Sequence, residues 1–170
     1  MKSYVALLRG VNLGKRQLKM EDLRRVATDL GLGDVRTYIA SGNLLFRSAK
    51  TEPTLKTMLE AAIGKHMGAR VGVMLRTADE LAAVSKANPF PDEPQNYVVA
   101  IFLDEAPPED SADHARNTDG ERIVLGKREF YVHYPRGQGQ SRLMIPAAAG
   151  GTARNMKTVA KLAELTREMQ

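Results

Sequence analysis

Two glycines, an asparagine and several cations follow the first apolar run of the chain. Residues 9–15 have the sequence RGVNLGK and come directly after the strand-forming residues 4–8. Backbone N–H groups in a glycine-containing turn can hold an anion, and arginine adds a charged fork. The spacing is one residue short of a phosphate-binding P-loop, and Arg16 stands where that motif needs serine or threonine. Arg9 and Asn12 are therefore candidates for one wall of an anion site rather than for a P-loop.

A second polar turn lies between two apolar runs. Ser41 and Asn43 flank Gly42, and Gly-Asn is typical of a hairpin turn because both residues tolerate positive φ. Ser41 and Asn43 are candidate ligand-binding residues. Asn12 and Asn43 can instead tie their turns through hydrogen bonds from the side chain to the backbone, and we favour that structural role.

A third candidate is the start of the last predicted helix, over residues 154–169. Thr152 or Asn155 can cap it, and a helix N-terminus attracts anions. Arg154 and Lys157 would oppose the helix dipole there, at a cost of about 0.3–1 kcal/mol each. That cost predicts an anion opposite Arg154, Asn155 and Lys157, or a carboxylate of the protein itself.

No catalytic set is recognisable. The histidines His66, His114 and His133 are scattered without metal-ligand spacing, and the chain has no cysteine. Asp104 and Glu105 close a predicted strand, and adjacent residues on a strand point to opposite faces, so they are a poor acid/base pair. We therefore expect no metal and no cofactor, and we assign no catalytic residue.

The charge is unevenly distributed. The net charge is +5, but residues 104–121 carry −6 and the rest of the chain +11. A basic surface favours anionic partners, including nucleic acid, although it also serves ordinary solubility. The longest uncharged run, residues 143–153, has 11 residues, whereas a membrane span needs about 20. These features predict a soluble, cytoplasmic protein with no membrane contact.

The periodicity predicts an α+β fold in two subdomains packed as one compact unit. Residues 1–77 follow a β-α-β-β-α-β order, which is that of a ferredoxin-like plait. Residues 78–170 predict a second, incomplete plait-like α+β subdomain without a clear final strand. The predicted strands are residues 4–9, 35–40, 44–48, 71–75, 97–103, 123–125 and 129–134, and the predicted helices are 20–30, 53–63, 79–87 and 154–169.

Three motifs together resemble a bacterial family of uncharacterised proteins, domain of unknown function 1697. They are residues 9–14 (RGVNLG), 38–43 (YIASGN) and 152–155 (TARN) with the following 158–162 (TVAKL). The resemblance implies a ferredoxin-like first part and a second α+β part. It does not assign an activity to the chain. Relatives often carry glycine at the position of Lys15 and tryptophan at that of Met156, so an aromatic ligand contact is not expected here.

The leading hypothesis is a protein that binds an anionic ligand, a nucleotide or a nucleic acid, at its basic loops. One alternative is an enzyme acting on a phosphorylated small molecule, with Arg9 and Arg154 as phosphate clamps. Another is a protein-interaction module that uses an exposed sheet edge or residues 104–121. The sequence leaves the ligand, the reaction and the oligomeric state open.

Overall fold

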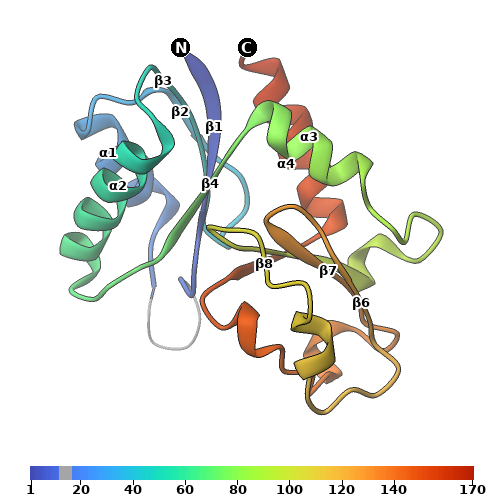
Figure 1. The fold of residues 1–170 in the computed structure, drawn as a ribbon. Coiled ribbons are helices and arrows are strands. Elements are labelled where there is room, and N and C mark those ends of the chain that lie inside the picture. Colours follow the sequence, from blue (N-terminus) through green and yellow to red (C-terminus); the bar gives the residue numbers. More distant parts are fainter. Residues whose placement is uncertain (12–16) are drawn as a thin grey trace. The chain divides into compact units, whose positions relative to one another are not determined.

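Two antiparallel sheets and four α-helices make up the described part of the chain, residues 1–11 and 17–170 of a computed structural model (Figure 1). The chain divides into two compact units. The first unit is Met1–Leu81 together with Leu162–Gln170, and the second is Ala82–Lys161. The mixed α+β class predicted from the sequence is confirmed.

The first unit follows the predicted order of strands and helices. Its sheet has the strand order β2-β3-β1-β4, and each neighbouring pair is antiparallel. Its elements are β1 (Lys2–Leu8), α1 (Met20–Asp29), β2 (Gly33–Thr37), β3 (Asn43–Ser48), α2 (Glu52–Met67) and β4 (Val73–Thr77).

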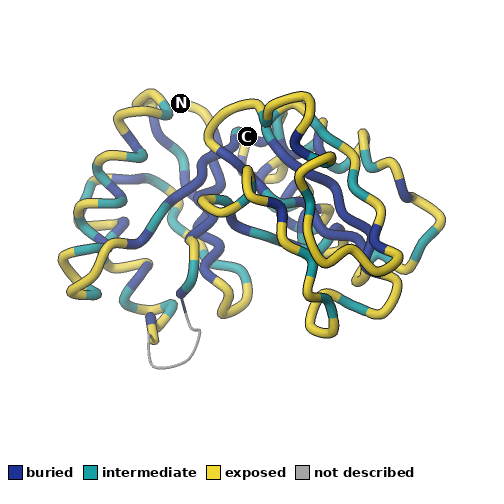
Figure 2. The backbone as a smooth tube through the Cα atoms, turned by 60° about the horizontal axis from the view of Figure 1, so that its bottom comes forward, coloured by how far each residue is buried: buried dark blue, intermediate teal, exposed yellow. Residues whose placement is uncertain are grey.

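β1 is buried on both of its faces, because every residue from Ser3 to Leu8 is buried. Figure 2 draws buried backbone in dark blue. Tyr4 and Leu8 point into a core with residues of α1 and α2, and the Tyr4 ring stacks on Phe46 with centroids 5.7 Å apart. Val5 and Leu7, on the opposite face, are fully buried as well. This double burial explains why the strand has a continuous apolar sequence rather than an alternating one.

The second unit repeats the strand order of the first. Its sheet has the order β6-β7-β5-β8, which matches β2-β3-β1-β4 when the strands are taken in chain order. Short 3₁₀ turns and irregular segments stand where the first unit has α1 and α2. The strands are β5 (Val98–Phe102), β6 (Arg122–Leu125), β7 (Glu129–His133) and β8 (Thr152–Asn155). Two helices are shared between the units: α3 (Ala78–Lys86) has its first residues, to Leu81, in the first unit, and α4 (Met156–Glu168) belongs to the first unit from Leu162 on.

The predicted helix over residues 154–169 starts too early, and the expected absence of a final strand is wrong. Thr152–Asn155 is β8, which pairs with β5 from Phe102↔Thr152 to Val99↔Asn155. A Cβ at Gly151 would lie 2.8 Å from the carbonyl oxygen of Phe102, so glycine lets the chain approach β5 closely. The ladder of backbone hydrogen bonds outweighs the local helix propensity of these residues.

Two hydrogen-bonded contacts fix α3. At its start, the Thr77 amide donates to Glu80 Oε1 (2.9 Å), and the Glu80 amide donates to Thr77 Oγ1 (3.2 Å), which is a capping box. Further along, Tyr131 of β7 donates its hydroxyl to the carbonyl oxygen of Val84 at 2.8 Å. The other face of this sheet packs Phe130 and Val132 in an apolar cluster.

We predict that Gly42→Ala lowers the free energy of unfolding by about 2–4 kcal/mol. Gly42 has φ +85°, and a Cβ there would lie 2.6 Å from Val11 Cγ2 and 2.9 Å from Leu8 Cβ. Urea unfolding measures the change.

Gly31→Ala is the matched control for this substitution. Gly31 has φ +84° but no neighbouring atom within 4 Å of the added Cβ. It carries the backbone strain alone, so the expected loss is about 1 kcal/mol. Equal losses in the two variants would contradict the packing argument.

Candidate functional site

Three chain segments meet where β1 ends. The Leu8 amide donates to the carbonyl oxygen of Gly42 (2.9 Å), and the Arg9 amide donates to that of Gly72 (2.9 Å). Arg9 thus lies between the turn that precedes β3 and the loop that precedes β4. We call this region the Arg9 end: Arg9, Gly10, residues 38–43, residues 64–72 and the start of α1.

Exposed cations gather at the Arg9 end. Four of them come from three segments: Arg9, Lys19, and Lys65 with Arg70. The carboxylate of Asp22, in the first turn of α1, is paired with Arg25 (2.9 Å) and lies 3.6 Å from His66. Described cations therefore outnumber carboxylates here. Asn12, a predicted site residue, lies outside the described residues.

Asn43 holds the turn beside Arg9. It is fully buried, and its Nδ2 donates to the carbonyl oxygen of Tyr38 and to Ser41 Oγ, both at 3.0 Å. This is the turn-tying arrangement that we favoured from the sequence. Ser41 itself is exposed, so Asn43 fixes the position of a hydroxyl group at the surface.

The junction of β8 and α4 differs from the prediction. Arg154 is only 8% exposed in β8, and its Nη1 donates to Thr152 Oγ1 (2.8 Å) and to the carbonyl oxygen of Ala153 (2.9 Å). Burial lowers the pKa of Arg154 to about 10. The argument from an opposed helix dipole is wrong for Arg154, because it lies in a strand.

Asn155 and Lys157 flank Met156, the first residue of α4. Asn155 Oδ1 accepts a hydrogen bond from the Thr158 amide at 2.9 Å, so Asn155 caps the helix as predicted. Lys157 is exposed in the first turn, where its charge opposes the dipole. The predicted residues thus form two groups: Arg9, Ser41 and Asn43 in the first unit, and Arg154, Asn155 and Lys157 in the second.

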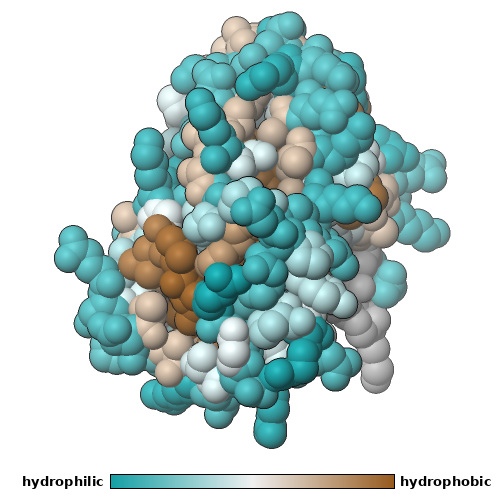
Figure 3. Space-filling view, turned by 90° about the vertical axis from the view of Figure 1, so that its right-hand side faces the viewer, coloured by the Kyte–Doolittle hydropathy of each residue, from teal (hydrophilic) through white to brown (hydrophobic). Residues whose placement is uncertain are grey.

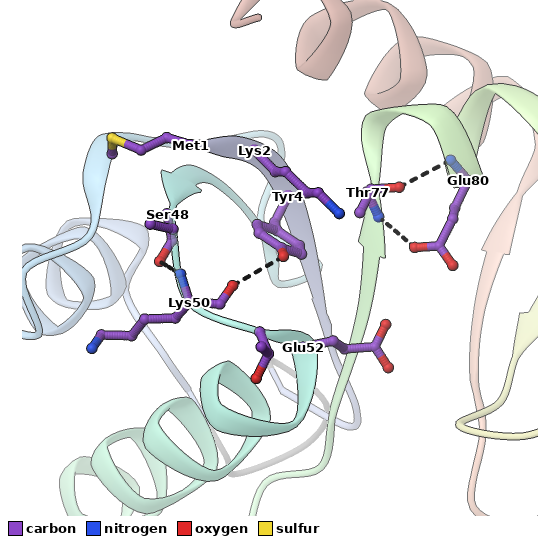
Figure 4. A pocket seen from close by; sticks show the side chains of 10 residues that line it. Met1, Lys2, Tyr4, Ser48, Lys50, Glu52, Thr77 and Glu80 are labelled. Carbon is purple, nitrogen blue, oxygen red and sulfur yellow. Dashed lines mark hydrogen bonds between the residues drawn. The ribbon is translucent and has the colours of Figure 1, made fainter.

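A cavity at the opposite end of the first sheet was missed by the sequence reasoning. It has a volume of about 590 Å³ (Figure 4). Tyr4 donates its hydroxyl to the carbonyl oxygen of Lys50 at 3.0 Å. Burial raises the pKa of Tyr4, and the charges of Glu52 and Glu80 raise it further. The lining residues are Met1, Lys2, Tyr4, Ser48, Ala49, Lys50, Thr51, Glu52, Thr77 and Glu80.

A small hollow in the second unit is filled by its own side chains. Its volume is about 10 Å³, which is room for about one water. Ser141 donates its hydroxyl to Glu121 Oε2 at 2.6 Å, and this bond lowers the pKa of Glu121. Tyr134 lines the same hollow, where burial and the charge of Glu121 raise its pKa to about 12. The hydrogen bond between Ser141 and Glu121 therefore stabilises the fold, and the hollow itself has no room for a ligand.

Most of the visible surface in Figure 3 is hydrophilic, with one apolar patch. Single exposed apolar side chains are ordinary on protein surfaces. Among the described residues, the large apolar side chains that are exposed are Met1, Ile39, Tyr97, Val124 and Met144.

Neither a metal cluster nor a membrane-spanning helix is found in residues 1–11 and 17–170. No three histidine or carboxylate side chains within this part are placed to hold a metal ion. No helix within it has the length and apolar character that crossing a bilayer needs.

A family model described as "Protein of unknown function (DUF1697)" matches residues 1–131. The chain belongs to the DUF1697 family. The match confirms the resemblance given by the sequence motifs. The matched part of this DUF1697 protein includes Arg9, Ser41 and Asn43, whereas the junction of β8 and α4 lies beyond it.

The fold of this DUF1697 protein is similar to that of a conserved bacterial protein from Streptococcus pneumoniae. The two chains share 24% sequence identity, and the similarity covers 98% of this chain and 99% of the other with a TM-score of 0.81. This similarity shows the fold alone. The search of curated proteins found no match.

We predict that Asn155→Ala lowers the free energy of unfolding by about 1 kcal/mol, because the Thr158 amide loses its acceptor. Asn155→Asp keeps an acceptor oxygen and serves as the matched variant, with an expected change of only a few tenths of a kcal/mol. Urea denaturation of both variants checks the cap. A larger loss in Asn155→Asp than in Asn155→Ala would refute it.

Tyr134 gives a pH dependence at alkaline pH. An unfolded tyrosine ionises at a pKa of about 10, whereas Tyr134 in the folded protein ionises at about 12. The folded state keeps a proton that the unfolded state loses, so this stabilisation is complete below pH 10 and is lost between pH 10 and about 12. Melting temperatures should therefore fall less steeply over this range in Tyr134→Phe than in the wild type. Parallel pH profiles would contradict the assignment.

Proposed function

We propose that this DUF1697 protein binds an anionic ligand, a nucleotide or a nucleic acid, at the Arg9 end of its first unit. The observation that supports this most is that three segments bring four exposed cations to that end: Arg9, Lys19, and Lys65 with Arg70. Arginine presents a planar fork that matches phosphate oxygens, and lysine adds a mobile point charge.

The division of charge between the two units also supports an anion site in the first unit. The first unit contains 15 lysines and arginines against 10 aspartates and glutamates, whereas the second unit contains 10 of each. The whole net charge of +5 therefore belongs to the first unit. An approaching polyanion is attracted to that unit, because long-range steering follows the summed charge.

Exposure favours Arg9 over Arg154 as the residue that contacts the anion. Arg9 is exposed, and its backbone is fixed by the hydrogen bond to Gly72. Arg154 is 8% exposed and already donates to two oxygens of the protein. A buried guanidinium cannot reach an external phosphate without exposing its surroundings, so Arg154 is assigned a structural role in β8.

The combined variant Arg9→Ala/Arg70→Ala tests the proposal. Fluorescence anisotropy with labelled single-stranded RNA and DNA oligonucleotides should show a dissociation constant at least roughly tenfold higher than for the wild type. Each lost phosphate contact should reduce the slope of log K against log salt by about 0.7. Thermal shifts with nucleotides and inorganic phosphate extend the test to small anions.

Arg167→Ala is the control, since it removes an exposed cation from the last turn of α4. It should leave binding unchanged. The proposal is overturned if the wild type binds none of these anions at low salt, or if the double variant binds them as the wild type does.

A further inference from the structure

The cavity at the start of β1 is formed by the first unit alone. β1 begins there, β3 and β4 end there, and α2 starts there. It therefore lies at the end of the sheet opposite the Arg9 end. Its volume of about 590 Å³ is within the range of small-molecule sites, roughly 300–1,000 Å³.

Three of the lining residues, Tyr4, Glu52 and Glu80, offer hydrogen-bond acceptors to a ligand. Tyr4 gives its hydroxyl hydrogen to Lys50, so the lone pairs of Tyr4 Oη can accept. Glu80 uses Oε1 in the capping box, which holds its carboxylate in one place. Figure 4 shows the Glu52 side chain extending from α2 towards the β4 side of the cavity, where Thr77 and Glu80 lie.

The Glu52 and Glu80 carboxylates both act on the Tyr4 hydroxyl. The charges of Glu52 and Glu80 each add to the effect of burial on the Tyr4 hydroxyl. The pair of carboxylates near the Tyr4 hydroxyl disfavours a phosphate or a carboxylate at that place. It favours a group that carries positive charge and several N–H donors.

Two lysines, Lys2 and Lys50, belong to this lining, and Lys2 is the one directed into the cavity. Lys2 lies two residues before Tyr4 in β1, so both side chains are on the same face of the strand. Figure 4 shows the Lys2 ammonium directed towards Thr77 and the Lys50 side chain extending away from Tyr4. A ligand held by the carboxylates could thus place a carboxylate of its own near Lys2.

We propose that this cavity binds a small amino-acid-like zwitterion, whose ammonium or guanidinium group lies between Glu52, Glu80 and Tyr4 and whose carboxylate contacts Lys2. Polar and apolar atoms contribute about equally to the lining, and most of the lining residues have polar or charged side chains. Such a lining suits a small charged molecule rather than a large apolar one. This cavity is separate from the proposed anion site at the Arg9 end, so the two proposals are tested independently.

The probes are L-lysine, L-arginine, 1,4-diaminobutane and glutarate. Titrations followed by two-dimensional ¹H–¹⁵N NMR of the full chain should show saturable shifts at Tyr4, Glu52 and Thr77 with the two amino acids. Diaminobutane should bind more weakly because it has no carboxylate for Lys2, and glutarate should not bind.

Charge-removing variants assign the contacts. Glu52→Gln should weaken L-lysine binding roughly tenfold, because a hydrogen bond to a charged group is lost. Glu80→Gln should weaken it similarly while glutamine keeps the capping box, so α3 is retained. Lys2→Gln should weaken L-lysine but leave diaminobutane unchanged.

Glu21→Gln is the matched control, since Glu21 is an exposed carboxylate in the first turn of α1 and does not line the cavity. It should bind like the wild type, and melting temperatures confirm that every variant is folded. The proposal is overturned if neither amino acid shifts these residues at about 10 mM, if glutarate binds there instead, or if both glutamate variants bind as the wild type does.

Discussion

The pairing of β1 with β3 on one side and β4 on the other is the constraint on which the first unit depends. β1 joins β3 from Lys2↔Ser48 to Leu7↔Asn43, and it joins β4 from Tyr4↔Thr77 to Leu8↔Val73. A slip of one residue would reverse every side chain of the strand. The same register brings loops together at both ends of the sheet, so the fold and the two candidate sites share one cause.

The second unit shows that this strand order does not require two covering helices. Irregular segments supply Ala115, Leu143 and Ile145 to the apolar face that Phe130 and Val132 present. Helices are one way to cover an apolar sheet face, and loops with apolar side chains at the right places are another. The two sheets correspond in topology, whereas their sequences show no residue-level repeat.

The order of elements in the first unit was predictable because its local signals agree with its tertiary structure. Leu55, Leu59 and Ile63 recur at helical spacing, and all three are buried against the sheet. β8 was not predictable in this way. Its sequence Thr-Ala-Arg-Asn has no apolar alternation, and it forms a strand because β5, about 50 residues earlier, offers a free edge.

For the candidate site residues, too, contacts between residues close in sequence were predictable and contacts between distant residues were not. The tie made by Asn43 was predicted, because it joins residues close in sequence. The cavity was not, because Lys2, Ser48, Glu52 and Glu80 meet only through the register of three strands. Contacts of long sequence separation leave no local pattern, so sequence periodicity cannot reveal a site built from them.

The discontinuity of the first unit has a consequence for synthesis on the ribosome. The second unit is one continuous stretch, Ala82–Lys161, whereas Leu162–Gln170 returns to the first unit with Leu162, Thr166 and Met169 buried. Domains generally form as their residues leave the ribosome. Here Met1–Leu81 must wait for Leu162–Gln170, which includes the second half of α4 and is translated after the whole second unit, so the first unit is completed after the second.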